Sequence, residues 1–202
     1  MKSLTQQNGN APTLEAKVKQ ALDDIGIPYE KWGKDGASET FPTLLDALGK
    51  NRITWDESEP EMLRKDVSVL YVTCQREGKT FQLREKSQVF RHNQYQFRHG
   101  LDGSLGETMV HTETALNAAL RGLEKLSQTE LRLKEVSAGD LSGFCRETFE
   151  PFTSPAYPPL LLELNRRKYS YCMPLELYHP EYVFEEFNKT TTYVWEEMKV
   201  KA

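Results

Sequence analysis

The order of apolar and polar positions predicts two helices at the start of the chain. Residues 1–12 are rich in Gln, Asn and Gly and are expected to form a disordered lead. Apolar side chains then recur every three or four residues over residues 14–25, after a threonine that can cap a helix. A second, short helix is predicted with Pro42 near its first turn and Gly49 as its stop. We therefore expect a small helical extension over residues 13–62.

The pattern changes to that of β-strands after residue 64. Residues 67–74, VSVLYVTC, are β-branched and nearly continuously apolar, and the turn REGK leads from them into residues 80–85. This order predicts a hairpin. Residues 89–98 contain two further short runs around the pair His92-Asn93 and predict a second hairpin.

The second half of the chain offers further strands between less regular segments. The proline-rich run EPFTSPAYPPLL cannot lie inside a central strand. The basic run at residues 165–168, NRRK, is interpreted as a solvated turn before a strand, and residues 180–187 are the one candidate for a late helix. Strands are predicted over residues 131–136, 167–177 and 190–198.

A glycine-rich loop leads into an amphipathic helix over residues 100–128. Apolar residues recur at helical spacing from Thr114 onward, so one face of the segment is apolar. Thr112 or Thr114 can cap the helix, and Glu113 lies where the helix dipole favours a carboxylate. A loop followed by a helix of this kind also occurs as ordinary core packing in many α/β proteins.

The spacing within this segment resembles the Nudix box, which that superfamily writes G-x5-E-x7-R-E-U-x-E-E-x-G-U, where U is aliphatic. Seven residues separate Glu113 from Arg121, and Leu123 fills the first aliphatic place. The resemblance implies an α/β (α+β) fold over residues 63–202, with a mixed β-sheet sandwiched by helices. It also implies a structural salt bridge between Glu113 and Arg121, and it makes a homodimer an expectation.

Two segments outside the box carry the same resemblance. The run PAYP and the later run TTYVW are similar to the closing strands of a group of Nudix-like proteins that carry a helical N-terminal extension. The segment EKWGKDGASETFPTLLDAL is similar to that extension.

The glutamates that hold Mg²⁺ in Nudix enzymes are missing. Aligned without gaps, their positions are occupied by Gly122, Lys125 and Leu126, and Glu107 replaces the opening glycine of the box. A lysine near the site repels a divalent cation. We therefore expect no metal, no cofactor and no catalytic residue.

Three functional hypotheses follow. The first is a catalytically degenerate Nudix-like domain that acts as a binding or interaction module for a nucleotide-like ligand or a protein partner. The second is a divergent Mg²⁺-dependent pyrophosphohydrolase of a nucleoside diphosphate derivative, with Glu107, Glu113 and Glu124 as an unusual ligand set. The third is an accessory subunit of a larger assembly.

A basic and aromatic cluster precedes the glycine-rich loop and is the candidate ligand site. Basic and aromatic side chains alternate there, so that a base could stack and a phosphate could be neutralised. A strand with an aromatic core face and a solvated charged face would show the same pattern. The residues are Arg91, Tyr95, Phe97, Arg98 and His99.

Composition excludes several classes of partner and site. The net charge of -4 provides no general attraction to DNA or to anionic lipid, and no apolar run approaches the length of a membrane-spanning helix. The cysteines, Cys74, Cys145 and Cys172, are far apart and odd in number. They indicate buried thiols in a reducing compartment, most simply the cytoplasm.

Overall fold

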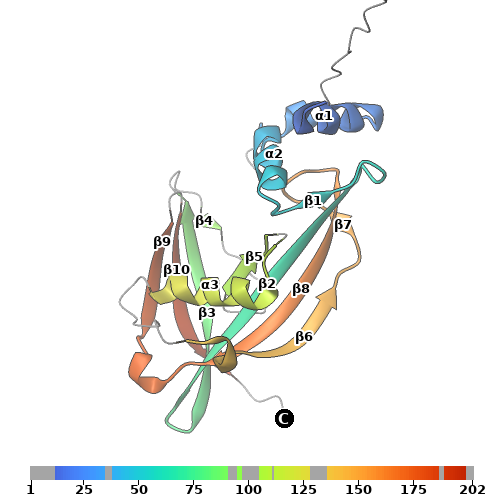
Figure 1. The fold of residues 1–202 in the computed structure, drawn as a ribbon. Helices are drawn as coiled ribbons and strands as arrows, with labels where there is room; N and C mark the ends of the chain where they lie inside the picture. Colours follow the sequence, from blue (N-terminus) through green and yellow to red (C-terminus); the bar gives the residue numbers. More distant parts are fainter. Residues whose placement is uncertain are drawn as a thin grey trace, which may run out of the picture. The chain divides into compact units, whose positions relative to one another are not determined.

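The computed structural model describes residues 12–34, 38–90, 95–96, 105–110, 112–127, 136–186 and 189–198. The chain divides into two compact units (Figure 1). Unit 1 comprises Met1–Arg64 and Pro151–Glu163, and unit 2 comprises Lys65–Glu150 and Leu164–Ala202. Helices and strands are mixed, so the α+β class expected from the sequence is confirmed.

Unit 1 contains both helices predicted for the start of the chain. Helix α1 spans Leu14–Asp24, and the Thr13 side chain caps it by accepting a hydrogen bond from the Ala16 amide at 3.2 Å. Helix α2 spans Phe41–Gly49. Short elements complete the unit: η1 (Tyr29–Lys31), β1 (Thr54–Trp55) and β7 (Phe152–Thr153). The buried core consists of Val18, Leu22, Trp32, Phe41, Leu44, Leu63, Tyr157 and Leu160.

Residues 151–163 belong to unit 1 although they lie far from the helices in sequence. The Trp32 indole N–H donates to the Pro158 carbonyl at 2.5 Å, and the Glu39 amide donates to the Ala156 carbonyl at 2.8 Å. The proline-rich run is therefore bound by its backbone carbonyls, which need no amide hydrogen from proline. The N-terminal extension predicted over residues 13–62 did not include residues 151–163.

Unit 2 is built on a sheet with the strand order β6-β8-β2-β3-β10-β9, and β4 and β5 pair with β3 and β2. Backbone hydrogen bonds join Leu161 to Glu61 and Met173 to Thr73, so β2 and β8 run parallel, whereas β2 and β3 form an antiparallel hairpin. The mixed sheet expected from the sequence is thus confirmed. The strands are β2 (Met62–Arg76), β3 (Lys79–Phe90), β4 (Tyr95–Gln96), β5 (Leu105–Thr108), β6 (Ser142–Thr148), β8 (Leu161–Cys172), β9 (Glu181–Glu186) and β10 (Lys189–Glu197).

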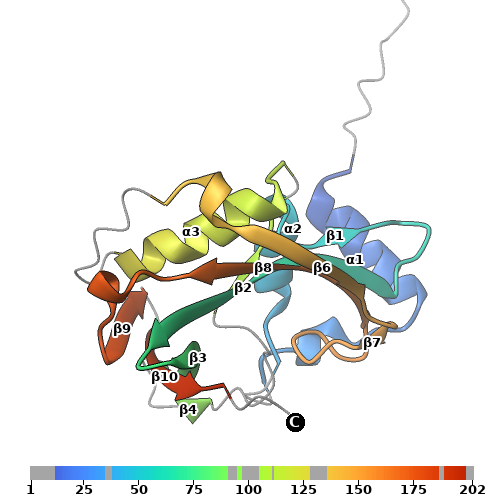
Figure 2. The ribbon, with the colours of Figure 1, turned by 90° about the horizontal axis from the view of Figure 1, so that it is seen from below.

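Helix α3, Ala115–Ser127, lies over one face of this sheet (Figure 2). Of the two threonines that could cap it, Thr114 does so, accepting a hydrogen bond from the Asn117 amide at 3.1 Å. Burial of each large apolar side chain between helix and sheet contributes about 1.5–3 kcal/mol. The core consists of Leu70, Val72, Leu83, Leu105, Ala119, Leu123, Leu141, Tyr171, Met173, Tyr182, Phe184 and Tyr193.

The basic run 165–168 was wrongly interpreted as a turn. It lies in the middle of β8, which begins six residues before the predicted strand, and it pairs along its length with β6. Strand β6 itself was missed, because residues after 137 show no apolar alternation: all but one of its side chains are exposed. The charged side chains can lie in strands here because β6 is exposed along most of its length and β8 is only partly buried.

The late helix proposed for residues 180–187 is also wrong. Residues 181–186 form β9, which pairs antiparallel with β10. Tyr182 and Phe184 are buried while Val183 is exposed, which is the two-residue period of a strand. The strand predicted over residues 131–136 lies, apart from its last residue, outside the described residues. In the predicted second hairpin, β4 pairs with the end of β3, and residues 91–94 lie outside the description.

Two of the three cysteines differ from the expectation of buried thiols. Cys74 is buried, but Cys145 and Cys172 are exposed, and none of the three is in a disulfide. No helix in the described ranges is long and apolar enough to span a membrane.

Candidate functional site

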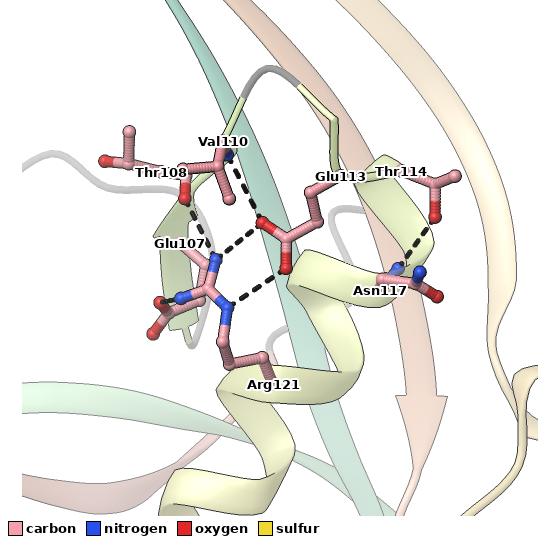
Figure 3. Close-up of polar contacts among 7 residues, drawn as sticks. All are labelled: Glu107, Thr108, Val110, Glu113, Thr114, Asn117 and Arg121. Carbon is pink, nitrogen blue, oxygen red and sulfur yellow. Dashed lines mark hydrogen bonds and ion pairs between the residues drawn. The ribbon is translucent and has the colours of Figure 1, made fainter. Parts of the chain in front are cut away.

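The two side chains that the resemblance pairs are in direct contact at the start of α3 (Figure 3). Arg121 lies two helical turns beyond Glu113. Its Nε donates to Oε1 of Glu113 at 3.1 Å, and its Nη2 donates to Oε2 at 2.8 Å. This two-pronged geometry matches the planar guanidinium to the carboxylate and ties the loop before α3 to the helix.

Arg121 also holds a second carboxylate and a backbone carbonyl. Its Nη1 donates to Oε2 of Glu107 at 2.6 Å, and its Nη2 donates to the Thr108 carbonyl at 3.0 Å. The Val110 amide donates to Oε2 of Glu113 at 3.3 Å. Figure 3 shows Glu107 and Glu113 on opposite sides of the guanidinium.

The three charged side chains are shielded from water to different degrees. The side chains of Glu107 and Glu113 are 12% and 13% exposed, and that of Arg121 is 38% exposed. The hydrogen bond from Arg121 lowers the pKa of Glu113, although burial opposes the shift. The hydrogen bond with Glu113 raises the pKa of Arg121. The Glu113–Arg121 pair is therefore fully ionised at neutral pH.

Residues 107 and 122, two positions at which the chain differs from the Nudix box, are neighbours in the structure. A Cβ atom added at Gly122 would lie 3.1 Å from Cγ of Glu107, which is closer than a comfortable carbon contact. A glutamate at position 122, as the box has it, would therefore push Glu107 away from Arg121. The glutamate at position 107 and the glycine at position 122 are sterically coupled.

The residues that the structure describes do not fit a Mg²⁺ site. Among the described residues, no group of three His, Cys, Asp or Glu side chains lies close enough together to hold a metal ion. Glu107 and Glu113 face Arg121, whereas Glu124 is on the exposed surface of α3. The ligand set on which the hydrolase hypothesis depends is not assembled in this structure.

The ligand-binding candidates of the sequence cannot be placed. Arg91, Phe97, Arg98 and His99 lie outside the described residues. Tyr95 is described in its backbone, which pairs with Val89 of β3. A ligand site in this segment stays a prediction.

Sequence reasoning missed the two backbone groups that complete the Arg121 site. The Thr108 carbonyl and the Val110 amide act through the main chain, so no residue type signals them. The sequence analysis named Glu107 as the residue that replaces the first glycine of the box and as a possible metal ligand. It did not predict that Glu107 accepts a hydrogen bond from Arg121.

Comparison with known proteins gives matches among solved structures only. No family model matches the chain, and no curated protein matches its sequence. An Ap4A hydrolase from C. elegans is 12% identical, with a TM-score of 0.35, and the match covers 66% of this chain and 80% of that one. A binary complex of a C. elegans Ap4A hydrolase aligns with the same identity and coverage at a TM-score of 0.36. The Nudix hydrolase RenU from M. Smegmatis is 10% identical, with a TM-score of 0.33, over 64% of this chain and 70% of that one. Matches at these identities and TM-scores assign no activity to this chain, and the chemistry of its site follows from its own residues alone.

Proposed function

We propose that this chain is a catalytically degenerate Nudix-like domain that works by binding, with a nucleotide-like ligand or a protein as its partner. The observation that carries the proposal is the engagement of a single guanidinium, that of Arg121, by both Glu107 and Glu113. These two carboxylates lie where the loop meets the helix. Both are directed at a fixed cation of the protein itself.

A divalent metal ion brought to the same carboxylates would meet the charge of Arg121. At a separation of about 4 Å and an effective dielectric constant of about 20, two unit charges repel by about 4 kcal/mol, and a divalent ion doubles this value. The ion would also have to break the 2.6 Å hydrogen bond between Arg121 and Glu107. The arrangement thus favours the internal ion pair over a bound cation.

The loop, the helix cap and the Glu113–Arg121 bridge remain, while the positions of the metal ligands differ. That combination keeps the shape of the loop and helix without the means to activate water on a metal. It supports a role that uses the surface of the domain for recognition.

The test is isothermal titration of Mg²⁺ and of Mn²⁺ into the protein, with and without ADP-ribose. Wild type is compared with Glu113→Gln and with Glu124→Gln, which removes a charge from the exposed surface of α3. Circular dichroism confirms that each variant is folded. We expect no cation binding that depends on Glu113.

Cation binding that is present in wild type but absent in Glu113→Gln would contradict the proposal, and its loss in Glu124→Gln as well would point to the ligand set of Glu107, Glu113 and Glu124. It would support the divergent Mg²⁺-dependent hydrolase and would justify a screen of nucleoside diphosphate derivatives.

A further inference from the structure

The strands β6 and β8 place two arginines directly opposite each other. Arg146 and Arg167 are register partners in this antiparallel pair, so their side chains leave the same face of the sheet with Cβ atoms about 4.5–5.5 Å apart. Both side chains are exposed. Within the described part of the chain, neither guanidinium has an ion-pair or hydrogen-bond partner. Like charges directly opposite each other destabilise a sheet, so the stability of the strand pair does not explain why both positions are arginine.

The neighbouring basic residues of β8 are, by contrast, engaged. Nζ of Lys168 lies 2.5 Å from Oε1 of Glu147, and the guanidinium of Arg166 lies over the ring of Phe149, 4.4 Å from its centre. Because side chains alternate along a strand, Arg166 and Lys168 project from the face opposite to Arg167. The unpartnered positive charge is therefore confined to one face.

A shallow cavity lies at the same place. It involves β6, the outermost strand of the order given above, which Figure 1 shows beside β8. Its volume is ≈ 270 Å³, and Gly143, Arg146, Arg167 and Tyr169 are among the residues that line it. Tyr169 is the register partner of Gly143, and a Cβ atom at Gly143 would lie 3.1 Å from its ring. The glycine thus leaves room for the partly buried tyrosine ring, which packs against the core of unit 2 and also lines the cavity.

A β-bulge between Gly143 and Cys145 sets this geometry. Phe144 is the extra residue, and beyond it the register continues with Cys145 opposite Lys168. Without the bulge, the alternation of side chains along β6 would be shifted by one residue, and Arg146 would not share a face with Arg167.

We propose that the cavity between β6 and β8 binds an organic phosphate that carries a planar ring, such as a nucleoside diphosphate. Arg146 and Arg167 bind the phosphate groups through paired N–H donors, and the ring of the ligand lies against Tyr169. The site is formed by strands that do not contribute to the Glu113–Arg121 site. The inference rests on the proposed function in one respect, since it names the ligand class of a domain that works by binding.

The experiment measures binding of ADP, inorganic pyrophosphate and adenosine by isothermal titration. The test variant is Arg146→Gln with Arg167→Gln. The matched control is Arg166→Gln, which removes the same charge one residue away on the opposite face. Both are expected to fold, because the arginines of the test pair are exposed and their removal relieves a repulsion, so the melting temperature should stay unchanged or rise slightly.

We expect ADP to bind more tightly than pyrophosphate and adenosine not to bind. The double variant should lose about tenfold or more in affinity for ADP, and the control should stay within about twofold of wild type. Equal affinity in wild type and double variant, or no ADP binding to wild type, would overturn the inference. So would a uridine oligonucleotide that binds through the same two arginines more tightly than ADP, because it would identify the surface as a nucleic-acid site.

Hydrolysis separates this inference from the proposed function. If wild type binds ADP through the arginine pair and also hydrolyses ADP-ribose in a manner that depends on Glu113, the proposed function fails and the inference stands. If neither property is found, the inference fails and the degenerate site is unaffected.

Discussion

Replacement of Arg121 by Met should destabilise unit 2 strongly, because it leaves two shielded carboxylates without their cation. In wild type the guanidinium makes four hydrogen bonds, at 2.6, 2.8, 3.0 and 3.1 Å, three of them to Glu107 and Glu113. Methionine preserves much of the length and apolar stem of the side chain and removes its charge.

The expected loss follows from the burial of the partners. Breaking a fully buried ion pair by removing one member costs about 3–5 kcal/mol, and breaking an exposed pair costs about 0.2–1 kcal/mol. The glutamates are 12% and 13% exposed and Arg121 is 38% exposed, so the site lies between these limits. We expect a loss of about 2–3 kcal/mol in the free energy of unfolding.

The assay is urea unfolding followed by circular dichroism, with wild type, Arg121→Met and a triple variant that adds Glu107→Gln and Glu113→Gln. The triple variant contains no stranded charge and should therefore be more stable than Arg121→Met alone, although it carries more substitutions. A loss below about 0.5 kcal/mol for Arg121→Met, the usual range for surface substitutions, would refute this reasoning. So would a triple variant less stable than the single one.

Three further predictions concern other groups. Arg121 lowers the pKa of Glu113 below its ordinary value of 4.5. The difference in stability between wild type and Glu113→Gln should therefore be complete above that pH and should shrink as the pH falls below it. A difference that stays constant in urea melts from neutral to strongly acidic pH would contradict this. Gly122→Ala should stabilise α3 by about 1 kcal/mol in a Glu107→Ala background. In wild type the gain should be smaller, because the new Cβ lies 3.1 Å from Cγ of Glu107. Equal gains in the two backgrounds of this double-mutant cycle would disprove the coupling. Burial raises the pKa of Tyr157 from 10.0 to about 12, and because the unfolded chain loses this proton first, stability should fall by about 2–3 kcal/mol as the pH rises from about 10 to about 12. Tyr157→Phe should reduce that fall, and ultraviolet titration of the folded protein should show one fewer late-ionising tyrosine in this variant than in wild type.

Local signals were sufficient for the helices and the main hairpin. The cap of α1 at Thr13 depends on contacts within one turn, and the turn between β2 and β3 depends on Gly78, whose φ of 75° favours glycine. Such features depend on residues that are close together in the sequence. The sequence therefore predicted these elements correctly.

Elements that depend on distant pairing were misread. The charged residues 165–168 form a strand only because β6 and β2 lie on either side of β8, and neither neighbour is adjacent in sequence. Segment 180–187 contains a proline and several glutamates, which obscured the alternation of Tyr182 and Phe184. In both cases tertiary contacts override local preference.

The candidate site likewise contains one contact that the sequence predicted and others that depend on strand pairing. The resemblance to the Nudix box implied the pairing of Glu113 with Arg121, and the two side chains are in contact in the structure. The contact of Glu107 with Arg121 depends on the pairing of β5 with β2, and the juxtaposition of Arg146 and Arg167 depends on a bulge. No spacing within the sequence encodes either arrangement.

The most direct test of the central claim is the rate of ADP-ribose and dinucleoside polyphosphate hydrolysis by the purified protein in the presence of Mg²⁺ or Mn²⁺, with Glu113→Gln measured in parallel. A degenerate site predicts that wild type releases product no faster than the Glu113→Gln variant. Turnover by wild type that disappears in this variant, while circular dichroism shows both to be folded, would contradict the account and identify the chain as an active hydrolase.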